Sequence, residues 1–523
     1  MDSFSNRDKD VFLITCEKMI DRGALMSRYS RTRELDIRKL WDKEFEGVPD
    51  RAEKFYERVF LEYGDESVAE LATAQVGIQN VSNVLSKIIE ESRIGLSYLE
   101  KSSRYVSYRD KKDGKYLYLE ADSAGIPQKF QKRYEEFNES IFELYERVAD
   151  GVASYIRENN PFENTRFYLP GGKEINPGDG GITEEMMRKA YDSSVRSRTL
   201  DEARFLLPAS TLTNIGISGN ARAFSHLLER LKSSQLKEAD KLYKDLLSEL
   251  KLVFPKLIDN VEKPHGIEGI EYLKKISTVL PEPISADSSF GEEVRLIFHE
   301  GDEKVINNVL SAHYFERTDG EFAALYSAIS SLDISKKREM LNRIMSLRGN
   351  RRQKPDRSFE HVRYTFEINT NFGAFRDFQR HRTLTVQRKK LTPNFGYDIP
   401  PIVSNIRELL KEYMNVMEES RKLFNDIYSE DRNAAQYVVL FAHKHPIIVT
   451  VNLRELVYLT DLRSTPQAHF DLRRLSRVMV DRVLEVNPSI TPAFKFLNTK
   501  EEELGRLSAE LRKEIKIKNE QKG

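Results

Sequence analysis

Hydrophobic residues recur every three to four positions along much of the chain, which is the spacing of amphipathic helices. The clearest examples are residues 128–158 and 404–428, where apolar and charged side chains occupy opposite helix faces. The alternation of apolar and polar residues that is typical of strands is rarer, and occurs at 116–119, 71–78 and 362–368. The pattern therefore predicts a helix-rich α+β protein with few strands.

Glycine and proline interrupt this pattern at two places. Residues 169–183 are rich in both and predict a loop. At 280–289, Pro281 and Pro283 precede three serines, and we expect a domain junction there. The last residues, 500–523, alternate charged residues with leucine and isoleucine at helical spacing, which predicts an exposed helix that ends in a frayed tail.

The parts of the chain before and after this junction resemble each other. Asn220-Ala221-Arg222 matches Asn452-Leu453-Arg454 with an offset of 452 − 220 = 232, and the same offset places Arg204 opposite Gln436. Two further pairs of segments match in the same order, namely 25–32 with 310–318 and 65–71 with 356–361.

Three matched pairs in one order indicate a duplicated domain. We expect a first repeat at 1–280 and a second repeat at 285–523 that includes the charged C-terminal helix. An insertion around 109–200 explains the longer spacing in the first repeat.

Composition excludes several classes of protein. The 523 residues include 83 Lys+Arg and 83 Asp+Glu, so the formal net charge is zero. No apolar run approaches the ~18 residues that span a bilayer. The single cysteine, Cys16, excludes an internal disulfide and a cysteine-rich zinc site. We therefore expect a cytoplasmic protein that does not bind membranes.

Two segments contain residues suited to phosphate or nucleotide binding. Arg380-His381-Arg382 places three cationic or titratable groups together, and arginine forks suit phosphate and pyrophosphate. Residues 97–106 combine the Ser102 hydroxyl, the Arg104 guanidinium and the Tyr105 ring, which can bind a nucleotide phosphate and base. A solvated basic face and an ordinary turn are the alternative interpretations of the two segments.

His443 and His445 form a His-x-His pair that can ligate a metal. Since Pro446 follows and no carboxylate is near in the sequence, a loop or helix-end position is the favoured interpretation. We therefore expect no metal site.

Taken together, these segments resemble the signature of the flavin-dependent thymidylate synthases. Arg380-His381-Arg382, after Phe359-Glu360-His361, is similar to its first part, and residues 97–105 are similar to its second part. The remaining similarities are to the family's nucleotide-binding stretch, at 203–208 and 220–222, and to its flavin-contacting helix, at 452–454, 462–463 and 467–469. The resemblance covers both halves and implies two tandem thymidylate synthase-like domains, helix-rich with a small sheet in each.

The two halves depart from the family pattern at different positions. In the first half, Ser92-Arg93-Ile94 stands where Arg-His-Arg is expected, and Leu231 stands at the position of Arg463. The departures in the second half are Lys390, Thr392 and Pro393 for Ser, Arg and Tyr, and Gln436 at the position of Arg204. Because each half keeps what the other has lost, a composite site between the repeats is the expected arrangement.

The resemblance implies FAD-dependent methylation of dUMP to dTMP, with methylenetetrahydrofolate as the one-carbon donor and NADPH as the reductant. A homodimer that imitates the family's tetramer is the implied assembly. The implied dUMP-binding residues are Glu100, Ser102, Arg104, Tyr105, Arg204 and Arg463, of which Arg204 and Arg463 are also assigned a catalytic role. The implied FAD-binding residues are Arg380, His381, Arg382, Asn452 and Arg454, with Ser30, Ser67 and Glu70 as weaker candidates.

Two other classes of function compete with this one. The lost motif residues allow a catalytically inactive interaction protein that retains the fold. A nucleic-acid-binding protein would use the basic residues of 348–354 and 380–390, but zero net charge argues against it.

Overall fold

The computed structural model describes residues 2–63, 66–169, 172–280, 282, 284, 290–501 and 503–521. Pro170 and Gly171 of the predicted loop lie outside the described residues, as do Pro281, Pro283 and the serines of the predicted junction. From 172 to 183 the chain forms only a two-residue strand and one 3-10 turn, which agrees with a loop.

The first part of the chain is mainly helical. Its α-helices are α1 (Met19–Tyr29), α2 (Ile37–Glu44), α3 (Arg51–Tyr63), α4 (Asn83–Glu91), α5 (Gln128–Asn159), α6 (Glu184–Ala203), α7 (Ala221–Ser233), α8 (Lys237–Val253) and α9 (Pro264–Thr278). Its strands are β1 (Thr73–Ser82), β2 (Leu96–Glu100), β3 (Phe167–Tyr168), β4 (Glu174–Ile175) and β5 (Leu212–Asn220). Its 3-10 helices are η1 (Glu66–Leu71), η2 (Phe162–Asn164), η3 (Asp179–Gly181), η4 (Arg204–Leu206) and η5 (Ile258–Glu262).

The second part follows a similar order. Its α-helices are α10 (Asp302–Phe315), α11 (Phe322–Ser330), α12 (Ile334–Ser346), α13 (Phe372–Phe378), α14 (Arg407–Tyr428), α15 (Leu453–Arg463), α16 (Phe470–Val486) and α17 (Leu507–Glu520). Its strands are β6 (Val294–Phe298), β7 (Arg363–Asn371), β8 (Thr385–Arg388) and β9 (Lys444–Asn452). Its 3-10 helices are η6 (Arg357–His361), η7 (Pro393–Phe395), η8 (Val403–Asn405), η9 (Ala434–Val438) and η10 (Pro488–Phe494).

The described strands form antiparallel sheets with the orders β1-β5-β2, β3-β4 and β6-β7-β9-β8. The strands β5 and β9 are matched at the offset of 232, and each ends in an asparagine that caps the following helix. The Asn220 side chain accepts a hydrogen bond from the backbone N–H of Ala223, and the Asn452 side chain accepts one from Glu455. The sequence similarity between 220–222 and 452–454 thus has a structural counterpart.

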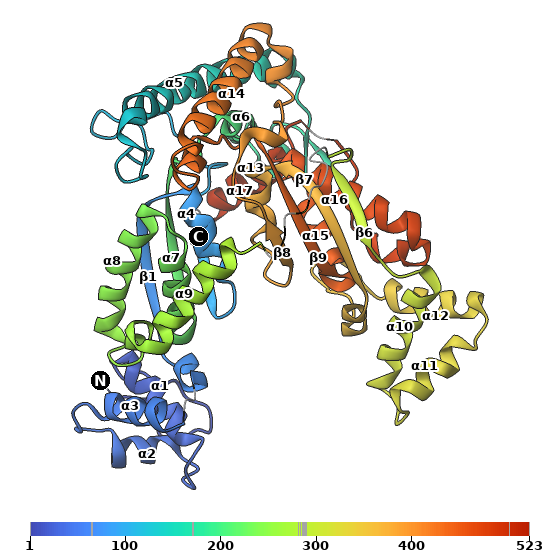
Figure 1. Cartoon of the computed structure of the whole chain (residues 1–523). Helices are drawn as coiled ribbons and strands as arrows, with labels where there is room; N and C mark the ends of the chain where they lie inside the picture. Colours follow the sequence, from blue (N-terminus) through green and yellow to red (C-terminus); the bar gives the residue numbers. More distant parts are fainter. Residues whose placement is uncertain are drawn as a thin grey trace.

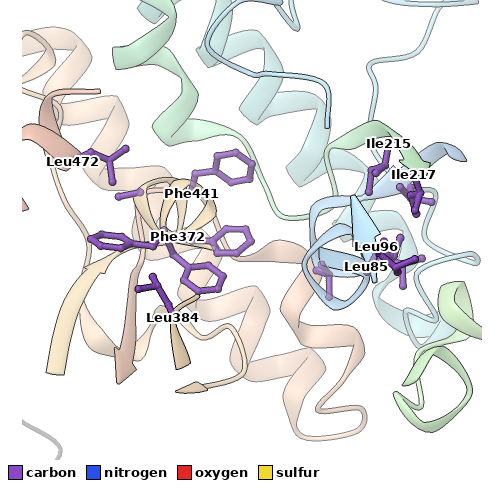
Figure 2. Packing of buried hydrophobic residues seen from close by; sticks show 14 of the residues in the cluster. Leu85, Leu96, Ile215, Ile217, Phe372, Leu384, Phe441 and Leu472 are labelled. Atoms are coloured by element: carbon purple, nitrogen blue, oxygen red, sulfur yellow. The ribbon is translucent and has the colours of Figure 1, made fainter. Parts of the chain in front are cut away.

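The molecule is an arch with two legs (Figure 1). One leg contains α1–α3, β1 and α7–α9, and the other contains β6, β7, β9, α10–α12, α15 and α16. The helices α5 and α14 lie together at the top, where Arg147 of α5 pairs with Glu412 of α14 at 2.6 Å. The buried hydrophobic residues form one cluster that runs through both halves, and Figure 2 shows Leu85, Leu96, Ile215 and Ile217 from the first half and Phe372, Leu384, Phe441 and Leu472 from the second.

The two halves meet in a nearly symmetric backbone contact. Pro208 forms an antiparallel bridge with Leu440, its counterpart at the offset of 232. The hydrogen bonds around this bridge occur in matched pairs: Ala209 N–H to Val439 O (2.8 Å) with Phe441 N–H to Leu207 O (2.9 Å), and Ser210 N–H to Tyr437 O (3.2 Å) with Ala442 N–H to Phe205 O (2.9 Å). Reciprocal contacts of this kind are those of a two-fold symmetric dimer, here within one chain.

Most of the elements predicted from the sequence are present. The helices at 128–158 and 404–428 are confirmed as α5 and α14, and the strands at 71–78 and 362–368 as β1 and β7. The predicted strand at 116–119 is wrong. Its tyrosines pack on α5 instead, with the Tyr116 ring stacked on Phe142 at 5.1 Å, and its only ladder contact is the bridge from Tyr118 to Thr211.

The predicted C-terminal helix is present as α17, but the expectation that it is exposed holds for only one of its faces. The helix α17 packs against α6, and Leu507 and Leu511 are buried. In the described part of the chain, no helix is both long and apolar enough to cross a membrane.

Candidate functional site

A cluster of arginines and aspartates lies where the two halves meet. Arg104 follows β2, and Arg204 begins η4, so both come from the first half. Asp377 in α13 and Arg463 at the end of α15 come from the second half. The pairing of residues 205–210 with 437–442 brings these elements together.

Asp377 connects the two halves electrostatically. Its Oδ2 lies 3.8 Å from Arg204 Nη1, and its Oδ1 lies 3.6 Å from Arg463 Nη1. Arg463 Nη2 also donates to the backbone carbonyl of Asp377 at 3.0 Å. Burial would raise the pKa of Asp377, but Arg463 and Arg204 outweigh it and hold the pKa well below its usual range.

Arg104 forms a second buried ion pair in this cluster. Its Nε and Nη2 donate to the two carboxylate oxygens of Asp201 at 2.7 and 2.8 Å, and Nη2 also donates to the backbone carbonyl of Gln467 at 3.1 Å. Burial would raise the pKa of Asp201, but the bidentate pair with Arg104 lowers it far below the usual value. Gln467 belongs to the second half, so this hydrogen bond crosses the junction, whereas the ion pair itself lies within the first half.

Arg204 retains donors that no described residue satisfies. The residue is 2% exposed, and its Nε and Nη2 are buried without a hydrogen-bond partner in the described part of the chain. Burial lowers its pKa to about 10, which leaves it charged at neutral pH. Because a buried charged donor without a partner is costly, these atoms suit an anionic or carbonyl-bearing ligand.

His381 is held between Glu455 and Arg463. Its Nδ1 lies 3.0 Å from Glu455 Oε1, and its Nε2 lies 3.0 Å from Arg463 Nε. Arginine Nε can only donate, so Nε2 accepts and the proton belongs on Nδ1, where it is donated to Glu455. Burial, with help from Arg463, lowers the pKa of His381, which is consistent with a neutral ring.

Glu100 is part of a neighbouring buried network. Its Oε1 pairs with Arg376 at 2.9 Å, and its Oε2 accepts from Lys87 at 3.0 Å. Arg376 also donates to Ser103 Oγ at 3.2 Å. Burial would raise the pKa of Glu100, but Arg376 and Lys87 lower it to about 2. Glu100 is therefore an anion that positions Arg376 and Lys87.

Further contacts join the two signature segments across the junction. Arg93 donates to the backbone carbonyls of His381 and Leu384 at 2.9 and 2.8 Å. Arg382 donates to Ser97 Oγ at 3.1 Å, and its guanidinium lies 5.9 Å from the Tyr98 ring centre. Arg380 and Arg382 are both exposed.

The structure shifts by one residue the first-half segment that corresponds to Arg380-His381-Arg382, when both halves are counted from the N-caps of equivalent helices. Ser82 caps α4 and Asn371 caps α13, an offset of 371 − 82 = 289. At this offset Arg380-His381-Arg382 corresponds to Glu91-Ser92-Arg93, whereas the sequence comparison places it opposite Ser92-Arg93-Ile94. Arg93 and Arg382 are then equivalent, and each reaches the opposite half.

The other residues expected at the site lie at its edge or apart from the arginine cluster. Ser102 Oγ accepts from the Arg104 backbone N–H at 3.3 Å, and Tyr105 is exposed beside it. Ser30 follows α1 and donates to the Ser27 carbonyl at 2.8 Å, and α1 lies at the far end of one leg (Figure 1). Ser67 and Glu70 belong to η1, which packs against α1.

Arg454 and Glu70 take part in equivalent ion pairs in the two legs. Arg454 pairs with Glu360 at 2.7 Å, and Arg222, its counterpart, pairs with Glu70 at 2.7 Å. Asn452 caps α15, the helix that ends at Arg463. Asn452 and Arg454 therefore lie at the start of the helix that ends at Arg463, whereas Glu70 lies in η1, which packs against α1 and α7.

The sequence comparison missed the acidic members of the cluster. Asp201 and Asp377 occupy ordinary helical positions, and their partners are distant in sequence. Glu455, three residues after Asn452, could have been suspected from its position in the first turn of the predicted flavin-contacting helix.

The two histidines of the pair, His443 and His445, lie in the interior of the second half. No cluster of three or more His, Cys, Asp or Glu suited to a metal occurs among the described residues. Both histidines are buried, and burial lowers their pKa values, to about 4 for His443. The expected loop or helix-end position is wrong for His445, which lies in β9 and packs against Phe375 at 4.8 Å.

A comparison with known families matches residues 17–256 and 295–489 to Thy1, described as thymidylate synthase complementing protein. The chain belongs to the Thy1 family. A UPF0159 protein of Thermoplasma acidophilum is 45% identical over 504 residues, which cover 95% of this chain and 99% of that protein. A flavin-dependent thymidylate synthase of Pyrococcus furiosus is 30% identical over 123 residues, which cover 23% of this chain and 48% of the relative. The structure of ThyX from Helicobacter pylori with FAD and dUMP aligns at 20% identity and a TM-score of 0.29, covering 40% of this chain and 99% of that one.

The offset of 232 defines a second position in this Thy1-family chain that is pseudo-equivalent to the cluster around Arg204. The side chains at this second position have different chemistry. There Gln436 replaces Arg204, and its Oε1 accepts from the Leu391 backbone N–H at 3.1 Å. Lys390 replaces Ser102 and donates to Asn433 at 2.8 Å. The cavity at this position, about 600 Å³, is lined by Leu231 and Asn433, the counterparts of Arg463 and Asp201. The two positions are therefore not interchangeable.

Proposed function

We propose that this chain is a flavin-dependent thymidylate synthase with one composite site, which methylates dUMP to dTMP using methylenetetrahydrofolate and NADPH. The observation that supports it most strongly is the ion-pair network in which Arg204 of one half and Arg463 of the other share Asp377. Family membership and the Pyrococcus furiosus relative point to the same reaction class. A homodimer is the proposed assembly.

In this proposal the nucleotide binds along Ser102, Arg104 and Arg204. The two unpartnered donors of Arg204 would meet oxygen atoms of dUMP, and the exposed Tyr105 would border the nucleotide. Glu100 acts by holding Arg376 and Lys87 in place. Arg463 and Arg204, fixed by Asp377, would stabilise negative charge that develops on the uracil ring.

The main proposed flavin contacts come from the second half of the chain. Arg380 and Arg382 present exposed guanidinium groups that suit the pyrophosphate of FAD, while Asn452 and Arg454 lie on the adjoining helix. Bound FAD would supply the redox chemistry of the one-carbon transfer, with reducing equivalents from NADPH. Neutral His381 fixes the orientation of Arg463 and exchanges no proton in this scheme. Ser30, Ser67 and Glu70 remain the weaker proposed contacts.

The test is an assay for dTMP formation with FAD, methylenetetrahydrofolate and NADPH. We expect dTMP from the wild-type chain and a loss of at least about a hundredfold in the Arg204→Gln variant, since an electrostatic donor at such a site contributes about 10²–10³ in rate. Absence of product from folded, flavin-loaded protein would contradict the proposal. That outcome would favour the alternative of an inactive interaction protein, which the motif residues lost in each half allow.

A further inference from the structure

The C-terminal segment (residues 503–521) lies against the candidate site although it follows the residues matched to the Thy1 family, which end at 489. Its helix α17 packs on α6, near the centre of the arch (Figure 1). Leu507 and Leu511 anchor it by burial, and Lys518 donates to the backbone carbonyl of Gly181 at 2.5 Å. The segment is thus an ordered part of the structure, packed beside Ser197 and Asp201 of α6.

Arg506 points from this segment into the site. It is 6% exposed, and its guanidinium carbon lies 4.5 Å from the Tyr105 ring centre. Its Nη1 donates to Ser197 Oγ at 3.2 Å, whereas its Nη2 is buried with no hydrogen-bond partner in the described part of the chain. One charged donor is therefore directed inward without an acceptor.

In the described part of the chain, Arg506 has no carboxylate as an ion-pair partner. Burial and the nearby Arg104 lower the pKa of Arg506, while Asp201 opposes the shift. Both carboxylate oxygens of Asp201 already accept from Arg104. A ligand anion would relieve the repulsion between the two guanidinium groups and supply the missing acceptor.

The C-terminal segment lines the cavity at only one of the two pseudo-equivalent positions. Leu504, Gly505 and Arg506 line a cavity beside Asp201 that has a volume of only about 30 Å³. Its counterpart beside Asn433 has about 600 Å³, and no residue of the C-terminal segment lines it. A volume of about 30 Å³ holds a water molecule and not a nucleotide, so the segment must lie further outward than it does here whenever a nucleotide occupies the pocket.

We infer that Arg506 is an additional phosphate-binding residue of the nucleotide pocket, supplied by a C-terminal lid that closes over a nucleoside monophosphate. The inference rests on the proposed function, because it takes dUMP as the occupant. When the segment covers a bound nucleotide from that outward position, Nη2 donates to a phosphate oxygen. The contacts with the Tyr105 ring and Ser197 hold the guanidinium before the nucleotide binds. Arg506 binds the ligand and takes no part in bond making or breaking.

The experiment measures the affinity of the full-length protein for dUMP and for deoxyuridine, which lacks the phosphate, by isothermal titration calorimetry. The variants are Arg506→Gln, Arg506→Lys and, as the matched control, Arg512→Gln, because Arg512 lies on the exposed face of the same helix. We expect Arg506→Gln to weaken dUMP binding about tenfold or more, as loss of a charge-assisted hydrogen bond does, without changing deoxyuridine binding. The dUMP affinity of Arg506→Lys should fall between those of the wild type and Arg506→Gln. Arg512→Gln should bind dUMP like the wild type.

Equal dUMP affinity of Arg506→Gln and the wild type would overturn the inference and leave the proposed function intact. An equal loss for dUMP and deoxyuridine would also overturn it, because the effect would then not depend on the phosphate. A wild-type protein that binds no dUMP would overturn the inference together with the proposed function. Thermal unfolding shows whether Arg506→Gln is folded, and if it is not, Arg506→Lys decides by the same criteria.

Discussion

Arg204 and Asp377 belong to opposite halves of the chain, yet Arg204 Nη1 lies 3.8 Å from Asp377 Oδ2. Both residues are buried, and the other oxygen of Asp377 faces Arg463. The ion pair thus joins the two halves within the candidate site. Its position also explains why neither half alone retains a complete set of motif residues.

The first prediction concerns the number of nucleotide sites. Arg204→Gln should abolish dUMP binding because the buried donors are lost, whereas Gln436→Ala at the pseudo-equivalent position should leave the affinity unchanged. Calorimetry should give one dUMP per chain. Two equivalent sites, or equal losses in both variants, would show that the second position also binds nucleotide.

The second prediction concerns stability. Asp377→Asn removes the shared counter-charge of the buried Arg204 and the partly buried Arg463, and should lower the free energy of unfolding by about 3–5 kcal/mol. The control is Asp426→Asn, which breaks an exposed pair with Arg133 and should cost about 0–1 kcal/mol. Urea denaturation measures both. A similar small loss in the two variants would mean that Asp377 is not essential to the junction.

The third prediction concerns pH. Burial raises the pKa of Glu202 from 4.5 to about 7, although Arg198 and the backbone N–H of Ile402 oppose the shift. The folded state then holds a proton that the unfolded state releases between these pH values, so stability falls as pH rises through this window. At about 1.4 kcal/mol per pKa unit, the loss from this group is about 3 kcal/mol.

Glu202→Gln should remove this loss, because the amide has no proton to release and its oxygen can still accept from Ile402. Its stability relative to the wild type should therefore increase by about 3 kcal/mol from pH 4.5 to 7. Glu136→Gln, on the exposed face of α5, should keep a constant difference across that range. A constant difference for Glu202→Gln as well would show that Glu202 is ionised throughout.

The fourth prediction concerns the flavin. Arg382→Gln should weaken FAD binding about tenfold, because an exposed guanidinium next to Ser97 and Tyr98 is lost. Arg407→Gln, an exposed arginine at the start of α14, is the control. Quenching of flavin fluorescence gives both affinities, and equal values would remove Arg382 from the flavin site.

The elements that depend on local pattern could be predicted from the sequence. The apolar spacing within 128–158 and 404–428 specifies α5 and α14, and turn chemistry specifies the loop after 172. The alternation at 116–119 failed as a predictor because its tyrosines are fixed by α5, with the Tyr118 hydroxyl donating to Glu135 at 2.6 Å. Tertiary packing there overrides strand propensity.

The site could be predicted only in part. The arginines Arg104, Arg204 and Arg463 stand in recognisable motifs, and the structure brings them to one cluster. The partners Asp201 and Asp377 stand in no motif, because their role depends on contacts between the two halves. Arg506 was missed because charge alternation in 500–523 is equally typical of a solvated helix, and only the packing of α17 on α6 buries it.

The central claim is that flavin and nucleotide meet at one composite site, and the visible absorbance spectrum of the flavin-loaded protein tests it most directly. Addition of dUMP should shift the flavin bands of the wild type, and Arg463→Gln should abolish the shift while FAD remains bound. A bound flavin whose spectrum does not respond to dUMP in the wild-type protein, or a protein that takes up no FAD, would contradict the claim.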